Sequence, residues 1–246
     1  MAKKSTDIIY GIHAVEAALR KHPENVLQVF VQQNRNDNRI KKILDIAKNS
    51  GVSLQSISND KLKDKCPKAR HQGVVAEIRR NDSDAVTLED VLEKDSVLLL
   101  VLDEVQDPHN IGACLRTADA TGVDAVIVSK NRSPALGPVI RNVASGAAET
   151  VPYIMVPNLA RALDKIKDSD VWVIGTSGDG AHNIYESKAS KRLALVMGSE
   201  GKGMRRLTRE ACDELVSIPM QGSVESLNIS VATAVCLYEI RRQQAT

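Results

Sequence analysis

Apolar positions in the first 80 residues follow two spacings. Ile12, Val15 and Leu19 recur at helical intervals, as do the apolar residues of the segment 40–47, so two amphipathic helices are predicted. Short apolar runs at 26–31, 52–57 and 73–78 are typical of strands. Residues 1–78 therefore predict a small α/β domain of their own.

Residues 79–95 are charged and weakly apolar, which predicts a linker, with Thr87 and Asp90 as capping residues of a short helix at 88–92. Beyond it, a second domain at 96–246 alternates strand and helix patterns. This alternation predicts a largely parallel sheet with helices on both faces. The strands are expected at 97–102, 124–129, 151–155, 171–176, 193–197 and 214–218, and the helices at 110–121, 138–148, 158–168 and 228–242.

Charge is distributed unevenly along the 246 residues, although the net charge is only +2. Residues 1–80 hold 16 Lys and Arg against 8 Asp and Glu, whereas residues 81–107 hold 1 against 9. The basic first block indicates contact with a polyanion, and a solvated face with surplus lysine is the alternative. With only six aromatic residues, a surface that stacks single-stranded bases on rings is not expected.

Several protein classes are excluded by what the chain contains. Its four cysteines, at 66, 114, 212 and 236, have neither metal-ligand spacing nor the density of a disulfide framework. The longest apolar run, 97–102, is far below the roughly 20 residues that span a bilayer, and the first residues lack a signal-peptide core. We expect a soluble cytoplasmic protein without membrane or metal. The acidic residues Asp103, Glu104 and Asp107 look like metal ligands, but a solvated turn before a helix explains them as easily, so they do not imply a metal.

In parallel sheets, ligands bind beyond the carboxyl ends of the strands, so the segments after the strands carry the candidate chemistry. After the strand at 97–102, Pro108 and Asn110 suit a helix start, with Asn110 as the predicted cap. Arg116 lies on a different helical stripe from Ile111 and Leu115. Its side chain is therefore expected to point to the strand ends or to solvent. An ordinary surface residue is the alternative to a functional one.

After the strand at 193–197, the segment 198–203 has the glycine order G-x-x-G-x-G. This order matches neither a phosphate-binding P-loop nor the dinucleotide fingerprint, which argues against a dehydrogenase, and a plain glycine turn is the alternative. The third segment, 217–230, concentrates polar residues before the last helix. Capping explains one of Ser226 and Asn228 but hardly both. A serine hydrolase is not indicated, because G-x-S-x-G is missing.

Taken together, the three segments resemble the motifs of the SpoU/TrmH family of RNA ribose 2'-O-methyltransferases. The resemblance covers 96–246 as the catalytic domain, and the first block resembles the ribosomal-protein-like RNA-binding domain that precedes it in part of the family. It implies a trefoil knot, which general rules on threading would not predict. It also implies a homodimer through the catalytic domain, with the site shared between subunits. The segments that carry it are Asn110-Ile111-Gly112 with Arg116, Met197 to Gly203, and Ile218-Pro219-Met220 with Ser226-Leu227-Asn228.

The resemblance implies S-adenosylmethionine as the cofactor. The cofactor pocket that it implies uses mainly backbone groups. Adenine needs hydrogen-bond donors and acceptors in one plane and an apolar slot, and the side chains of Ile218, Met220 and Leu227 are expected to supply that slot. The residues implied are Thr176, Ser177, Gly198, Ile218, Met220 and Leu227.

The catalytic residues that the resemblance implies are Asn110, Arg116, Glu200, Ser226 and Asn228. Since a guanidinium keeps its proton in nearly all proteins, Arg116 is expected to orient a phosphate and stabilise the developing alkoxide, with proton abstraction as the alternative. Glu200 is expected to grip the guanidinium, and Asn110 to position Arg116 or the ribose. Ser226 and Asn228 would complete a polar wall.

The resemblance implies large-subunit rRNA as the substrate, at a guanosine in the peptidyl-transferase loop of 23S rRNA. A tRNA, another rRNA site, or a non-catalytic RNA-binding protein of the same fold are the alternatives. The first block would recognise folded RNA by shape and phosphate contacts. Its candidate contacts are Arg35, Arg39, Lys41, Lys42, Lys61, Lys63, Lys65, Lys68 and Arg70.

Overall fold

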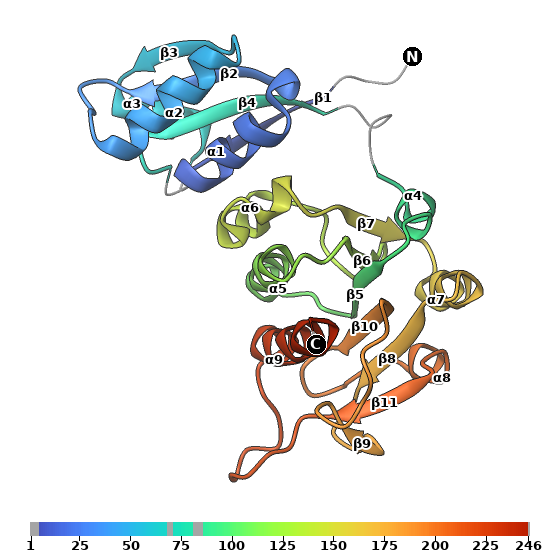
Figure 1. Ribbon diagram of the computed structural model, residues 1–246. Coiled ribbons are helices and arrows are strands. Elements are labelled where there is room, and N and C mark those ends of the chain that lie inside the picture. The colour runs from blue at the N-terminus through green and yellow to red at the C-terminus, as the bar shows by residue number, and fades with distance from the viewer. Residues whose placement is uncertain (1–4, 68–70, 81–85, 246) are drawn as a thin grey trace. The chain divides into compact units, whose positions relative to one another are not determined.

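The computed structural model describes residues 5–67, 71–80 and 86–245. Contacts divide the chain into two compact units. The first takes its residues from 1–85 and 138–150, and the second from 86–137 and 151–246. Figure 1 shows the elements of each unit by label and colour.

A mixed four-stranded sheet forms the first unit, in the order β1-β4-β2-β3. β4 pairs antiparallel with β1 and β2, and β2 pairs parallel with β3. The two helices and three strands predicted from apolar spacing are confirmed. The elements are β1 (Ser5–Tyr10), α1 (Ile12–Lys21), η1 (Pro23–Asn25), β2 (Val26–Gln32), α2 (Asn38–Asn49), β3 (Ser53–Ile57), α3 (Asn59–Lys65) and β4 (Val74–Arg80), together with α6 (Pro138–Ala144) and η3 (Ala147–Glu149).

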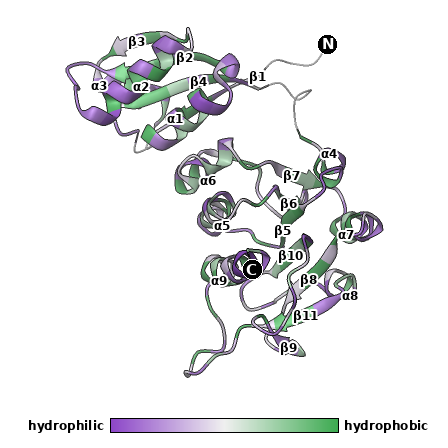
Figure 2. Ribbon diagram, viewed as in Figure 1, coloured by the Kyte–Doolittle hydropathy of each residue, from purple (hydrophilic) through white to green (hydrophobic). Residues whose placement is uncertain are grey.

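Each face of this sheet packs against a hydrophobic core. Ile12 of α1 and Ile43 of α2 pack on one face. Leu62 of α3 packs with Phe30 and Val75 on the other. In Figure 2 the hydrophobic colour follows the strands, whereas the outer helices carry much of the hydrophilic colour. Since α3 buries one residue, Leu62, its sequence has too little apolar periodicity to predict a helix.

Seven strands form the sheet of the second unit, in the order β7-β6-β5-β10-β8-β11-β9, and every pairing is parallel. The predicted parallel sheet is confirmed. The elements are α4 (Leu88–Leu92), β5 (Val97–Asp103), α5 (Pro108–Ala120), β6 (Ala125–Ser129), β7 (Tyr153–Val156), α7 (Leu159–Asp168), β8 (Trp172–Thr176), β9 (His182–Asn183), β10 (Arg192–Gly198), α8 (Arg206–Glu210), β11 (Glu214–Ser217) and α9 (Ile229–Gln244).

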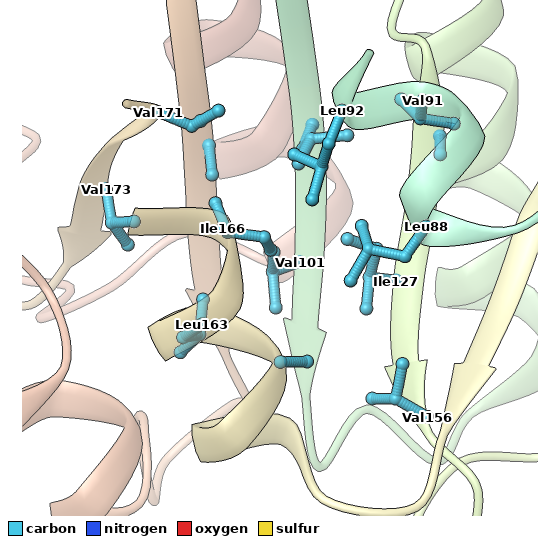
Figure 3. Packing of buried hydrophobic residues seen from close by; sticks show 14 of the residues in the cluster. Leu88, Val91, Leu92, Val101, Ile127, Val156, Leu163, Ile166, Val171 and Val173 are labelled. Carbon is cyan, nitrogen blue, oxygen red and sulfur yellow. The ribbon is translucent and has the colours of Figure 1, made fainter. Parts of the chain in front are cut away.

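Helices cover both faces of this sheet, as predicted. α5 and α9 lie on one face, and α4, α7 and α8 on the other (Figure 1). Leu88 and Leu92 of α4 and Leu163 of α7 point into a core with Val101 and Ile127 of the strands (Figure 3). The interior strand β5 is buried along its whole length, which is typical of a parallel strand covered on both sides.

Two helix boundaries differ from the prediction. Asp107, not Asn110, caps α5, because Pro108 suits the first helical position and the Asp107 side chain accepts a hydrogen bond from the backbone N–H of His109 at 2.9 Å. The helix predicted at 138–148 is interrupted at Gly146, whose φ of 99° is left-handed. The capping box of Thr87 and Asp90 is confirmed.

The strand order and registers describe pairing and not threading, so the trefoil knot stays a prediction. Within the residues that the structure describes, no helix combines the length and the apolar character needed to cross a membrane.

Candidate active site at the carboxyl ends of the central strands

A cavity of about 320 Å³ opens at the carboxyl ends of β8, β10 and β11, beside the start of α9. Its size falls in the range of about 300–1,000 Å³ that is usual for small-molecule sites. All the residues predicted to bind a cofactor line it, namely Thr176, Ser177, Gly198, Ile218, Met220 and Leu227, and so do two predicted catalytic residues, Glu200 and Ser226.

The glycine segment after β10 closes on itself beside the cavity. The backbone N–H of Ser199 donates to the Gly203 carbonyl at 3.1 Å, and that of Gly203 donates back to the Ser199 carbonyl at 2.9 Å. A Cβ at Gly198 would lie 2.2 Å from the Gly203 carbonyl carbon, and Gly203 itself has a left-handed φ of 66°. The turn itself therefore requires glycine at 198 and 203.

Gly178 differs from these glycines. It lines the cavity, yet a Cβ there would meet no atom within 4 Å, and its backbone is not in the left-handed region. Neither packing nor conformation in the described residues requires glycine at this position. The backbone at Gly178 is therefore open to close approach by a ligand.

The chemistry of the cavity wall selects the type of ligand. Ile218, Met220 and Leu227 supply apolar surface, and Glu200 and Glu225 supply carboxylates. Among the described lining residues there is no Lys, Arg or His, so the wall is poorly suited to phosphate groups. It suits a ligand with a flat apolar part and positive charge, as S-adenosylmethionine has in its adenine, sulfonium and ammonium groups.

Asn110 and Asn228, which are 118 positions apart, meet directly. The side-chain oxygen of Asn228 caps α9 by accepting from the backbone N–H of Ser230 at 2.9 Å. Its amide nitrogen is then left to donate to the side-chain oxygen of Asn110, at 3.1 Å. The first and third motifs are thus joined, and the orientation of the Asn228 amide is fixed by its capping role.

Arg116 lies apart from this group. It is exposed on α5, while Ile111 and Leu115 are fully buried. Arg116 comes six positions after Asn110, which places the two residues about 9 Å apart along the helix axis and about a third of a turn apart around it. Arg116 does not line the cavity, and across the described ranges no hydrogen bond or ion pair joins it to Glu200. The expected grip of Glu200 on Arg116 is therefore not formed within one chain.

An ion-pair network missed by sequence reasoning lies at the end of β5. Asp103 is fully buried and accepts from the backbone N–H of Arg205 at 2.9 Å and from its Nε at 2.8 Å. Glu104 pairs with Arg205 at 3.7 Å and also with Arg132. The interpretation of Asp103 and Glu104 as a solvated turn is therefore wrong, because both are held by arginines from distant segments. In the described part of the chain no group of His, Cys, Asp and Glu side chains could hold a metal.

Comparison with known proteins assigns the family. Residues 97–238 match the model of the SpoU rRNA Methylase family, and residues 8–83 match the model described as RNA 2'-O ribose methyltransferase substrate binding. The chain belongs to the SpoU rRNA methylase family. The resemblance seen in the three motifs, and the substrate-binding domain before them, are thereby confirmed.

This SpoU family chain is also similar to characterised proteins along almost its whole length. It is 49% identical over 245 residues to the 23S rRNA (guanosine-2'-O-)-methyltransferase RlmB of Vibrio vulnificus, with 98% of each chain covered. A crystal structure of an RNA 2'-O ribose methyltransferase matches with a TM-score of 0.82 and 26% identity, covering 98% of this chain and 90% of that one. The SpoU methyltransferase AviRb of Streptomyces viridochromogenes, in complex with its cofactor AdoMet, matches with a TM-score of 0.80 and 24% identity, covering 98% and 91%.

SpoU methyltransferases use S-adenosylmethionine, so the predicted cofactor is confirmed. The cavity fits it on the grounds already given: the open backbone at Gly178, the apolar side chains and the carboxylates. The individual residue assignments of the site stay predictions.

Proposed function

We propose that this protein transfers the methyl group of S-adenosylmethionine to the ribose 2'-hydroxyl of a guanosine in the peptidyl-transferase loop of 23S rRNA, in the cytoplasm. The observation that carries the proposal is the cavity, whose wall unites the second and third motifs beside the Asn110–Asn228 pair. A non-catalytic RNA-binding protein would need neither feature. The 49% identity to the RlmB of Vibrio vulnificus, over 98% of each chain, supports the choice of 23S rRNA.

The residues of the site act by orientation and charge. S-adenosylmethionine supplies, when bound, an activated methyl group on a sulfonium. Thr176, Gly198 and Leu227 hold the cofactor. The hydrogen bond that Asn110 accepts from Asn228 positions the Asn110 side chain, and Asn110 in turn orients the ribose. Arg116 orients the neighbouring phosphate and stabilises the negative charge that develops on the 2'-oxygen. The 2'-hydroxyl proton passes to solvent, and the methyl group leaves the sulfonium sulfur for the 2'-oxygen, so that S-adenosylhomocysteine is the leaving group.

We also propose that the protein is a homodimer in which Arg116 acts on the cavity of the partner subunit. Within one chain Arg116 is exposed and does not line the cavity. On α9, Val231 and Tyr238 are exposed by 49% and 58% and lie on one helical stripe, which a subunit interface would cover.

Mixing two inactive variants tests this arrangement. We combine an Arg116→Ala chain with a Gly178→Val chain, in which the added side chain on the cavity lining is expected to obstruct the cofactor, after dissociating and reassociating the subunits. If the site is shared, half of the dimers are mixed and each has one intact site, so activity returns to about a quarter of the wild-type value. No recovery, with mixed dimers present, would contradict a shared site.

RNA recognition is proposed for the first unit. Three predicted contacts already have partners in the fold: Arg35 bonds to Asp37 and the Gln72 carbonyl, Lys42 pairs with Glu16, and Lys65 lies 3.8 Å from the centre of the Phe30 ring. Lys68 and Arg70 lie outside the described residues. Arg39, Lys41, Lys61 and Lys63 are exposed and remain the proposed phosphate contacts, Lys63 despite a surface pair with Asp60.

Transfer of labelled methyl to unmodified large-subunit rRNA and to unmodified tRNA tests the activity. We expect label in rRNA from the wild type and at least a hundredfold slower transfer from Arg116→Ala, about the loss seen when an oxyanion-stabilising group is removed. Label in tRNA would overturn the substrate. Cofactor and RNA binding without transfer to either would favour the non-catalytic alternative.

A further inference from the structure

One wall of the cofactor cavity is an exposed turn that follows β8. Ser177 and Gly178 line the cavity, and the turn closes where the backbone N–H of Gly180 donates to the Ser177 carbonyl at 3.1 Å. The turn is pressed against β11, because a Cβ at Gly180 would lie 2.5 Å from the backbone of Val216. The position of this wall therefore depends on what holds the turn.

The turn is held from the other side by Arg209 of α8. One guanidinium nitrogen donates to the Ser177 hydroxyl and to one Asp179 oxygen, both at 2.9 Å, and the second nitrogen donates to the other Asp179 oxygen at 2.9 Å. Ser177 completes the network by donating to Asp179. The Arg209 guanidinium holds the pKa of the Asp179 carboxyl well below its usual range. This planar fork engages both ends of the segment 177–179 at once.

α8 is fixed at both ends, so it can act as a rigid support for Arg209. Before the helix, Arg205 is bound to the buried Asp103. After it, the backbone N–H of Asp213 donates to the Val173 carbonyl at 2.8 Å, and the Asp213 carboxylate accepts from the Val173 N–H at 2.9 Å. Only Met204 and Arg205 separate α8 from the glycine segment 198–203, so the helix links two walls of the same cavity.

We propose that Arg209 is a positioning residue for the cofactor, which sets the Ser177–Gly178 wall through its fork to Asp179. This rests on the proposed use of the cavity for S-adenosylmethionine. The pair is too exposed to matter much for overall stability: the side chains of Arg209 and Asp179 are 39% and 70% accessible, and ion pairs in water contribute little. Its effect is local.

Cofactor binding by the full-length protein tests the proposal. For Arg209→Ala we expect the Kd of S-adenosylmethionine and of S-adenosylhomocysteine, measured calorimetrically, to rise about tenfold because the wall is no longer held in place. Transfer at saturating cofactor should change less than about threefold, which makes the defect one of KM and not of kcat. The Tm should stay within about 2 °C of the wild type.

Two further variants and a matched control separate positioning from general damage. Asp179→Asn removes the charge from the other half of the fork and should weaken binding in the same direction, whereas Arg209→Lys keeps the charge without the fork and should restore binding only in part. Arg206 lies on the same helix but pairs with Glu210, so Arg206→Ala should bind the cofactor normally.

Unchanged Kd values in both Arg209→Ala and Asp179→Asn would overturn the proposal. So would an equal loss of affinity in Arg206→Ala, because the effect would then belong to the helix and not to the fork. Failure of the wild type itself to bind S-adenosylmethionine would overturn the use of the cavity, and the role of Arg209 with it. The wild-type titration therefore distinguishes the two failures.

Discussion

Replacing Gly198 by alanine probes the glycine segment that forms one wall of the cavity. The added Cβ would lie 2.2 Å from the Gly203 carbonyl carbon and 2.3 Å from the Met204 nitrogen. Both are backbone atoms, so a side-chain rotation cannot relieve the overlap. The segment 199–203 must move away from the end of β10, and the two hydrogen bonds between Ser199 and Gly203 must stretch or break.

The expected cost follows from these two effects. Overpacking a closed site costs about 1–3 kcal/mol. Each lost backbone hydrogen bond adds about 1 kcal/mol. Because Gly201 and Gly203 are exposed, the turn can move toward solvent and relieve part of the overlap. We expect the free energy of unfolding of the second unit to fall by about 2–3 kcal/mol.

Urea unfolding followed by tryptophan fluorescence measures this loss in the right unit, since the one tryptophan, Trp172, begins β8. Gly222→Ala is the matched control, because a Cβ there would meet nothing within 4 Å, and its midpoint should not move. S-adenosylmethionine affinity should fall with Gly198→Ala alone. A loss below about 0.5 kcal/mol with unchanged affinity would refute the reasoning.

Three other outcomes are expected. Gly178→Ala should weaken S-adenosylmethionine binding measured calorimetrically, without changing the urea midpoint, because the added Cβ meets no protein atom; normal binding would remove the evidence that a ligand approaches this backbone. Burial raises the pKa of the Cys114 thiol to about 11 and that of Cys236 to about 12. The unfolded chain therefore loses these protons first, so stability is complete below about pH 9 and falls above it by up to about 1.4 kcal/mol per pH unit and thiol. Urea titrations at pH 8 and pH 10 should show a shallower fall for Cys236→Ala, and equal slopes would contradict the assignment. Asp103→Ala should cost about 2 kcal/mol of unfolding free energy in the same assay, because it leaves Arg205 without its buried partner; a change near zero would show that the network does not stabilise the unit.

The main features of the fold were predictable because burial imposes periodicity on the sequence. The six apolar residues at 97–102 indicate a strand covered on both sides, and β5 is an interior strand that is buried along its whole length. β1 was missed, although it pairs along its whole length with β4, because only Ile9 among its described side chains is buried. α8 and β9, with five and two residues, are too short for any periodicity and depend on tertiary contacts.

The candidate site was predictable only in part. The motif resemblance selected the residues that line the cavity, since family motifs preserve chemistry at fixed spacing. It did not reveal contacts between distant segments, such as Asn110 with Asn228 or Asp103 with Arg205, because no local pattern encodes which far residues meet. Arg209 and Asp179 were missed for the same reason. The position of Arg116 outside the cavity also follows from the fold and not from its motif.

Mapping the methylated nucleotide tests the central claim most directly. Unmodified 23S rRNA is incubated with the protein and S-adenosylmethionine, and 2'-O-methylated positions are located by their resistance to alkaline cleavage. The account predicts one protected position, a guanosine in the peptidyl-transferase loop, and predicts that its protection is lost with Arg116→Ala. Methylation on a base, protection only at positions outside this loop, or undiminished protection with Arg116→Ala would contradict the account.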